Sequence, residues 1–143
     1  MSADLSVNLG GLRLRNPVMV ASGTFGYARE FASLMDLNQL GAIVVKGLAL
    51  TPVKGNPPPR IVETAAGMIN AIGLQNIGVE AFCSDALPEL RARGAVVAVN
   101  VFGERMEEYL EVIGRCEREE GVAAYELNVS CPNVTAGGIE FGH

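Results

Sequence analysis

One lysine stands where an apolar run ends, and its charge makes it the first candidate for chemistry. Lys46 follows Ala42-Ile43-Val44-Val45 and precedes Gly47. An ammonium group at the end of a buried strand requires an anion, a dipole or a ligand, because an unpaired buried charge is costly. Lys46 therefore predicts a site for an anionic ligand. A side chain that reaches solvent, or that pairs with Glu126, remains the alternative.

A cysteine after another apolar run could act as a nucleophile or as a base. Cys131 lies in the segment Asn128-Val129-Ser130-Cys131-Pro132-Asn133, between polar side chains and next to a proline that restricts the backbone. Neighbours that lower the pKa of such a thiol would make it reactive, whereas an exposed cysteine without a role is the alternative. Cys83 and Cys116 fall at apolar positions of expected helices, which predicts that they are core residues.

The stretch from Thr51 to Asn76 is predicted to be a long irregular loop, and loops of this length usually carry function. It contains Asn56-Pro57-Pro58-Pro59-Arg60 and ends with Gly67-Met68-Ile69-Asn70-Ala71-Ile72-Gly73-Leu74-Gln75-Asn76. Backbone amides exposed at glycine, together with amide side chains, suit a small, polar, planar ligand. The alternative is a lid in which asparagines stabilise turns and Asn76 caps the following helix.

The composition argues against several classes of function. The 143 residues include 11 Lys and Arg against 16 Asp and Glu, so the net charge of −5 gives no basic surface for nucleic acid. No signal peptide and no apolar run long enough for a bilayer is visible, which predicts a cytoplasmic protein without a membrane partner. Three cysteines without a C-x-x-C pair favour neither disulfides nor a metal or iron–sulfur site in this chain. The single histidine, His143, does not favour a hydrolase triad.

The elements that would position these residues alternate between strands and helices. A hairpin is predicted over 5–14 around Gly10-Gly11. Strands are predicted at 17–22, 42–46, 95–101 and 123–130, and helices at about 29–40, 78–93 and 104–119. Two of the helices have an apolar stripe, formed by Val79, Phe82, Cys83, Ala86, Leu87 and Leu90 in one and by Met106, Tyr109, Leu110, Ile113 and Cys116 in the other.

Apolar strands joined by helices predict a parallel sheet covered by helices. A small doubly wound sheet and part of a (β/α)8 barrel both fit. Neither G-x-G-x-x-G nor G-x-x-x-x-G-K-[ST] occurs, which weakens the first of these. In both architectures the carboxyl ends of the strands hold the active site, so Ser22, Lys46, Asn100 and Asn128 should converge on one pocket.

Several segments, in this order, resemble the class 1 dihydroorotate dehydrogenases, which are flavin enzymes of pyrimidine biosynthesis, and most closely their NAD-linked type B catalytic subunits. The resemblance covers the chain from about residue 5 to its end and is carried by 16–26, 45–47, 56–60, 67–76, 99–101 and 128–133. It implies an α/β fold of the (β/α)8 TIM-barrel class, here roughly its first four β/α units after a small β-hairpin.

The resemblance also implies a role for each matching residue. Contacts with the cofactor FMN are implied for Ala21, Ser22, Lys46, Gly47, Asn100 and Asn128. Contacts with the orotate ring and carboxylate are implied for Lys46, Asn70, Ala71, Ile72, Gly73, Leu74, Asn128 and Asn133. Cys131 would be the catalytic base that removes the C5 proton of dihydroorotate while a hydride leaves C6 for flavin N5, and Lys46 would supply positive charge beside them.

The activity that the resemblance implies is the oxidation of dihydroorotate to orotate, with electrons passed to NAD through a partner subunit. That subunit would carry FAD and a [2Fe–2S] cluster and would join a homodimer of catalytic subunits in a heterotetramer. Because a complete barrel takes about 250 residues, residues 1–143 are expected to be a single domain, the N-terminal half of a flavin-binding barrel truncated after strand four and inactive alone.

Two other interpretations stay open at this point. The chain could belong to another flavin-dependent pyrimidine oxidoreductase, such as a dihydropyrimidine dehydrogenase or a tRNA dihydrouridine synthase, although the net charge of −5 counts against tRNA. It could also be a non-catalytic half-barrel binding fragment, which flavin absorbance of the purified protein would test.

Overall fold

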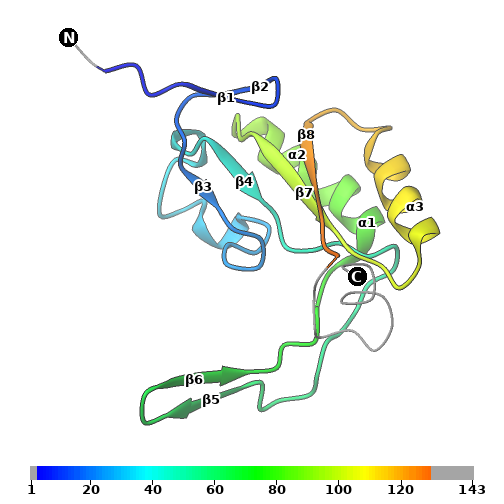
Figure 1. The fold of residues 1–143 in the computed structure, drawn as a ribbon. Helices are drawn as coiled ribbons and strands as arrows, with labels where there is room; N and C mark the ends of the chain where they lie inside the picture. Colours follow the sequence, from blue (N-terminus) through cyan, green and yellow to red (C-terminus); the bar gives the residue numbers. More distant parts are fainter. Residues whose placement is uncertain (1–2, 130–143) are drawn as a thin grey trace.

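A parallel four-stranded sheet organises the structure (Figure 1), a computed structural model that describes residues 3–129. The strands are β3 (Met19–Val20), β4 (Ala42–Val44), β7 (Val97–Val101) and β8 (Val122–Leu127), and they neighbour one another in that order. Each neighbouring pair is parallel. The four predicted strands are thereby confirmed, each shorter than expected.

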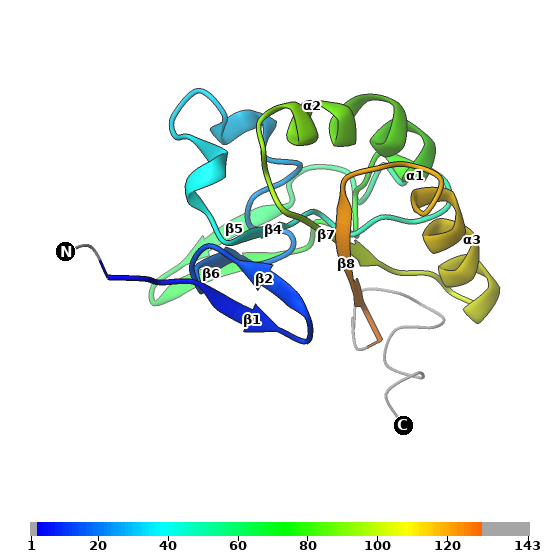
Figure 2. The ribbon, with the colours of Figure 1, turned by 90° about the horizontal axis from the view of Figure 1, so that it is seen from above.

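The sheet has two different faces, because successive strand residues point to opposite sides. Figure 2 shows that the helices lie on one of these faces. The residues that pack into the core with the helices are Ile43, Val45, Val97, Val99 and Val101. On the other face, the alternate residues of β7 and β8 are small or polar, namely Ala98, Asn100, Ala124 and Glu126. The strands that look uniformly apolar in the sequence therefore have a second face of the sheet with a different composition.

The predicted helix over 78–93 is confirmed as one helical run. It consists of α1 (Gly78–Ala81), the π-helical segment η3 (Phe82–Ala86) and α2 (Leu87–Ala92). Its predicted apolar stripe is buried at every position. Pro88 stands in the first turn of α2 and has no N–H to donate, and the wider π turn just before it accommodates the proline without ending the helix.

The next helix, α3 (Met106–Cys116), is shorter than predicted, and its stripe was partly wrong. Tyr109, Val112 and Cys116 are buried, whereas Met106 and Leu110 are 67% and 64% exposed. The buried face is thus the one that Val112 shares with Tyr109 and Cys116. No helix within residues 3–129 is long and apolar enough to cross a membrane.

The predicted helix over 29–40 is wrong. The chain forms two short 3-10 turns instead, η1 (Arg29–Phe31) and η2 (Leu37–Gln39). Between them Asp36 has an extended backbone, and its side chain accepts a hydrogen bond from the N–H of Asn38 at 3.0 Å. Such a local bond from an aspartate offers the backbone an alternative to a continuous helix.

Two hairpins lie at opposite ends of the sheet (Figure 1). The hairpin of β1 (Val7–Leu9) and β2 (Leu12–Leu14), which the sequence predicted, lies where the sheet strands begin. The second hairpin, β5 (Ile61–Thr64) and β6 (Gly67–Asn70), projects beyond their carboxyl ends. It corrects the prediction that 51–76 is irregular.

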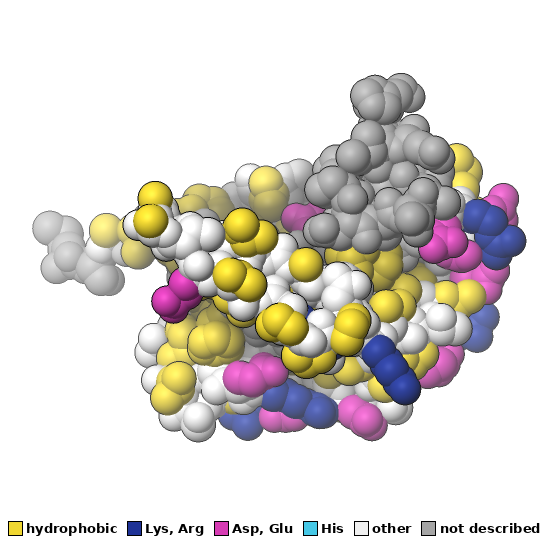
Figure 3. Space-filling view, turned by 90° about the horizontal axis from the view of Figure 1, so that it is seen from below, with side chains coloured by type: hydrophobic (Ala, Val, Ile, Leu, Met, Phe, Trp, Pro, Cys, Tyr) yellow, Lys and Arg dark blue, Asp and Glu magenta, His cyan; other side chains and the backbone are white. Residues whose placement is uncertain are grey.

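All residues of β5 and β6 are exposed, including Ile61, Val62, Met68 and Ile69. Figure 3 views the molecule from the carboxyl end of the sheet, where hydrophobic side chains gather on the surface. The apolar residues of the second hairpin therefore add nothing to the core that holds the sheet.

Candidate active site at the strand ends

Lys46 lies two residues after the end of β4 and is half-buried beside a tight turn. Its backbone N–H donates to the carbonyl oxygen of Gly26 at 2.9 Å. A Cβ built on Gly23 would lie 3.7 Å from Nζ of Lys46, so the ammonium group sits against this glycine. Within residues 3–129 Lys46 forms no ion pair, and Glu126 bonds to another residue. The alternative in which Lys46 pairs with Glu126 is thus wrong.

The turn after β3 brings two further predicted residues near the ammonium group. The carbonyl oxygen of Ala21 accepts from the N–H of Thr24 at 3.2 Å and from its hydroxyl at 2.7 Å. Gly23 within this turn has a φ of +80°, a conformation that glycine adopts without strain. Ala21 and Ser22 therefore lie in the same turn as the glycine that Nζ of Lys46 approaches.

Asn100 lies near the end of β7 against the backbone of Gly47. A Cβ on Gly47 would be only 2.7 Å from Oδ1 of Asn100 and 3.2 Å from the ring of Phe102. The Asn100 side chain is buried, and its Nδ2 donates to Oε1 of Glu126 in the neighbouring strand. The close approach requires a residue without a side chain at position 47.

Asn128 follows β8 and has its backbone fixed from two sides. Its N–H donates to the carbonyl oxygen of Val101 at 2.9 Å, and its own carbonyl oxygen accepts from the hydroxyl of Tyr109 at 2.6 Å. The Asn128 side chain makes no hydrogen bond to the rest of the described chain. Sequence reasoning took Tyr109 only as a core residue, because nothing in the spacing reveals a bond from a helix to a strand end.

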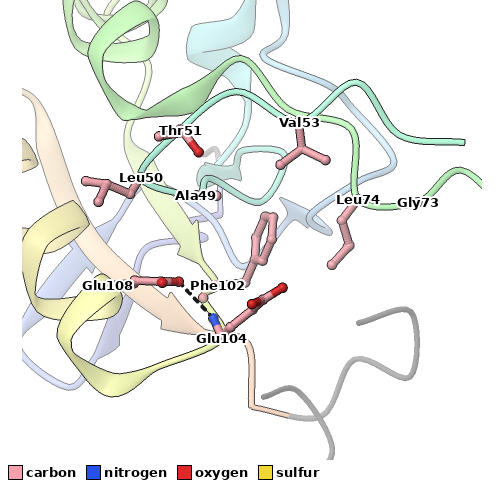
Figure 4. A pocket seen from close by; sticks show the side chains of 10 residues that line it. Ala49, Leu50, Thr51, Val53, Gly73, Leu74, Phe102, Glu104 and Glu108 are labelled. Atoms are coloured by element: carbon pink, nitrogen blue, oxygen red, sulfur yellow. Dashed lines mark hydrogen bonds between the residues drawn. The ribbon is translucent and has the colours of Figure 1, made fainter. Parts of the chain in front are cut away.

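The predicted substrate segment divides between two cavities. Ile72 lines a cavity of about 350 Å³ together with Lys46. Gly73 and Leu74 line a larger cavity of about 440 Å³ with Phe102 and Glu104 (Figure 4). Asn70 and Ala71 are exposed and line neither of these cavities. The described chain thus brings Ile72 to Lys46, but not Asn70 or Ala71.

An arginine that the sequence did not single out for a role anchors this segment. Arg60 donates from Nη2 to the carbonyl oxygen of Lys54 at 2.8 Å, from Nη1 to the side chain of Gln75, and from Nε to the carbonyl oxygen of Asn56. Asn56 in turn donates from Nδ2 to the carbonyl oxygen of Ala71 at 2.9 Å. These bonds join the two chain segments that lead into and out of the β5–β6 hairpin.

Asn76 has a structural role, as the alternative for this segment proposed. It is 5% exposed, and its Oδ1 accepts from the N–H groups of Gly78 at 2.9 Å and Ala49 at 3.3 Å. Its Nδ2 donates to the carbonyl oxygen of Leu74 at 3.0 Å. Asn76 therefore ties the first residue of α1 to the chain after β4, although the N-cap position itself is Ile77.

Tyr27 is a further residue of the Lys46 cavity that sequence reasoning missed. Its hydroxyl oxygen accepts from the N–H of Ile77 at 3.4 Å. Burial raises the pKa of Tyr27 to about 12, so the phenol is neutral near pH 7.

The prediction that Cys83 and Cys116 are core residues is confirmed. Cys83 and Cys116 are buried free thiols. Burial raises the pKa of both, that of Cys116 to about 12, which keeps them protonated and unreactive. Cys131 and Asn133 lie outside the described residues.

The match to one protein family extends over almost the whole chain. Residues 4–143 match the family model described as dihydroorotate dehydrogenase. This chain belongs to the dihydroorotate dehydrogenase family. The family's (β/α)8-barrel fold agrees with the parallel sheet and its helices, so the predicted fold class is confirmed.

Curated relatives in the dihydroorotate dehydrogenase family are similar over nearly the whole chain. The catalytic subunit of dihydroorotate dehydrogenase B (NAD(+)) from Pelobacter propionicus is 58% identical over 142 residues, which are 99% of this chain and 47% of the relative. The subunit of the same name from Geotalea daltonii is 56% identical over 139 residues, 97% of this chain and 46% of the relative. The chain spans about half the length of the curated relatives it matches.

A solved dihydroorotate dehydrogenase shares the fold. The crystal structure of the enzyme from Eimeria tenella in complex with ferulenol has a TM-score of 0.72 and 26% sequence identity to this chain. The match covers 92% of this chain and 38% of the Eimeria tenella chain.

Proposed function

We propose that this chain is part of a catalytic subunit that oxidises dihydroorotate to orotate with FMN, in the synthesis of pyrimidines. The observation that carries the proposal is the shared position of Lys46, Asn100 and Asn128. All three lie at the carboxyl ends of neighbouring parallel strands, where barrel enzymes hold their active sites.

The residues present fit a flat, polar cofactor such as FMN. Gly47 keeps the space beside Asn100 clear of a side chain, and Lys46 has no anionic partner within residues 3–129. Ala21, Ser22, Lys46, Gly47, Asn100 and Asn128 would hold the FMN. When bound, FMN supplies the acceptor for a hydride.

The protein's own side chains would handle the substrate and the proton. Lys46 would bind the anionic carboxylate, because its charge is uncompensated, and Ile72 would lie beside it in the same cavity. Asn70, Ala71, Gly73, Leu74, Asn128 and Asn133 would complete the contacts with the ring. Cys131 would accept the C5 proton as the hydride leaves C6, so that the C5–C6 double bond of orotate forms.

The same proposal includes a partner and a place in the cell. The names of the relatives contain "catalytic subunit" and NAD(+), which supports electron transfer to NAD through a separate subunit. That subunit would carry FAD and a [2Fe–2S] cluster. A homodimer of catalytic subunits joined to that subunit, in the cytoplasm, completes the proposal. Residues 1–143 would form one domain, the N-terminal half of the barrel.

Anaerobic flavin reduction tests the activity. The full-length protein that contains this chain is expected to purify with FMN, and dihydroorotate should bleach its visible absorption within seconds. Replacing Cys131 by Ser should slow this bleaching by about a hundredfold or more, the usual contribution of a general base, while FMN stays bound. Cys83→Ser is the matched control, because Cys83 is a buried residue of the helical segment η3 and is not among the proposed cofactor or substrate contacts.

Three results would contradict the proposal. A colourless protein would favour a non-catalytic binding role. Bleaching by dihydrouracil but not by dihydroorotate would identify a different pyrimidine oxidoreductase. Normal bleaching in the Cys131→Ser variant would remove Cys131 from the role of base.

A further inference from the structure

Glu126 is a charged residue at the strand ends to which neither the motifs nor the cofactor contacts assign a role. It pairs with Asn100 in the register of β7 and β8, and Nδ2 of Asn100 donates to its Oε1. Both side chains lie on the sheet face opposite the helices, near the carboxyl ends of β7 and β8. Within residues 3–129 Glu126 forms no ion pair. The hydrogen bond from Asn100 is the polar contact that its side chain makes with this part of the chain.

A carboxylate can only accept hydrogen bonds, and this fixes the direction of the Asn100 side chain. The amide group of Asn100 must turn its NH₂ toward Glu126. Its Oδ1 consequently faces the other way, toward Gly47, where it lies 2.7 Å from the position of a Cβ. Without Glu126, the amide could present either its oxygen or its nitrogen to Gly47 with a similar shape.

We propose that Glu126 is a positioning residue that makes Asn100 present a hydrogen-bond acceptor, not a donor, to the cofactor site. The inference rests on the proposed function, because it concerns how that site recognises its ligand. A ligand that matches must offer an N–H group to this acceptor. The imide N–H of a flavin ring has this chemistry, whereas a carbonyl edge would face Oδ1 unfavourably.

Three variants of nearly identical shape test the direction of the bond in the FMN-containing holoenzyme. Asn100→Asp replaces the NH₂ that faces Glu126 by an oxygen, so two carboxylate groups meet and FMN affinity should fall about tenfold or more, as when a hydrogen bond to a charged group is lost. Glu126→Gln keeps an acceptor for Asn100 and should change FMN affinity by about twofold or less.

The double variant Asn100→Asp with Glu126→Gln is the decisive member of the set. The new glutamine can donate its NH₂ to the new aspartate, which again leaves an oxygen facing Gly47, so FMN affinity should recover to within about threefold of the parent protein. The measurement is the dissociation constant of FMN from titration of the apoprotein, followed by quenching of flavin fluorescence. Glu111→Gln, an exposed glutamate in the middle of α3, is the matched control and should change nothing.

The outcomes separate the inference from the proposed function. A parent protein that binds no FMN overturns the proposed function. A parent that binds FMN, with an Asn100→Asp variant that binds equally well, overturns the role of Glu126 alone. The same conclusion follows if the double variant is as weak as Asn100→Asp, because the second substitution then fails to restore the direction of the bond.

Discussion

The candidate site consists of individual residues, and they differ in whether their position in the sequence reveals their hydrogen-bond partners. Lys46 was singled out because a charge after four apolar residues is costly unless it meets a partner. Asn100 was singled out from its place near the end of an apolar strand, and the roles of both residues stay predictions. Glu126 and Tyr109 were not, because each acts through a hydrogen bond between elements that are distant along the chain. A sequence pattern records where a side chain stands on its own element, not which atom it meets on another.

Gly47 offers a test of the site at this scale. A methyl group at position 47 would meet Oδ1 of Asn100 at 2.7 Å and the Phe102 ring at 3.2 Å, so Gly47→Ala should destabilise the protein by about 1–3 kcal/mol through overpacking. It should also weaken FMN binding, because Asn100 must move. Urea unfolding and flavin titration measure the two effects.

The matched control for this substitution is Gly114→Ala. Gly114 lies within α3 with nothing within 4 Å of an added Cβ, and alanine there should stabilise the protein by up to about 1 kcal/mol. Equal effects of the two substitutions would contradict a specific requirement for glycine at position 47.

The elements were predicted best where side chains alternate or recur with a clear period. The strands and the helix over 78–92 follow such patterns, and their burial agrees with them. The segment 29–40 failed because Asp36 forms a local bond that the apolar pattern does not reveal. The hairpin of β5 and β6 was missed because all its residues are exposed, so neither of its faces has a distinct composition.

Arg60 gives a prediction for how one element is held. Its three side-chain hydrogen bonds connect the segments on either side of the second hairpin, so Arg60→Met should loosen 70–76 without unfolding the sheet. Loss of these bonds should speed amide hydrogen exchange in that segment by about tenfold or more. Exchange followed by mass spectrometry over 54–76 measures this.

An exposed arginine of the first hairpin provides the comparison. Arg13 forms no ion pair or side-chain hydrogen bond within the described chain, so Arg13→Met should leave exchange over 54–76 unchanged. If Arg60→Met also leaves it unchanged, the hairpin is held by its own backbone bonds and Arg60 does not anchor it.

At the scale of the whole molecule, the alternation of strands and helices predicted a parallel sheet covered by helices, and the resemblance to the dihydroorotate dehydrogenases then favoured the barrel class over a doubly wound sheet. It did not predict how the substrate segment divides between two cavities, since that depends on the path of the second hairpin beyond the sheet. The same packing that forms the core also buries several groups that ionise at alkaline pH.

These buried groups predict how stability depends on pH. Burial raises the pKa of Cys116 from 9.0 to about 12 and that of Tyr27 from 10.0 to about 12, and it raises the pKa of Cys83 and Tyr125 as well. The folded state therefore binds these protons more tightly than the unfolded state does. Their contribution to stability is complete below about pH 9 and is lost as the pH rises toward 12.

The free energy of unfolding should accordingly fall by on the order of 5 kcal/mol between pH 8 and pH 11.5, because each tenfold change in proton affinity corresponds to about 1.4 kcal/mol. Urea unfolding under reducing conditions measures it. Tyr27→Phe removes one of the buried groups, so its unfolding free energy should decline less steeply above pH 10 than that of the parent protein. Equal slopes for the two proteins would mean that the Tyr27 phenol ionises as readily in the folded chain as in the unfolded one.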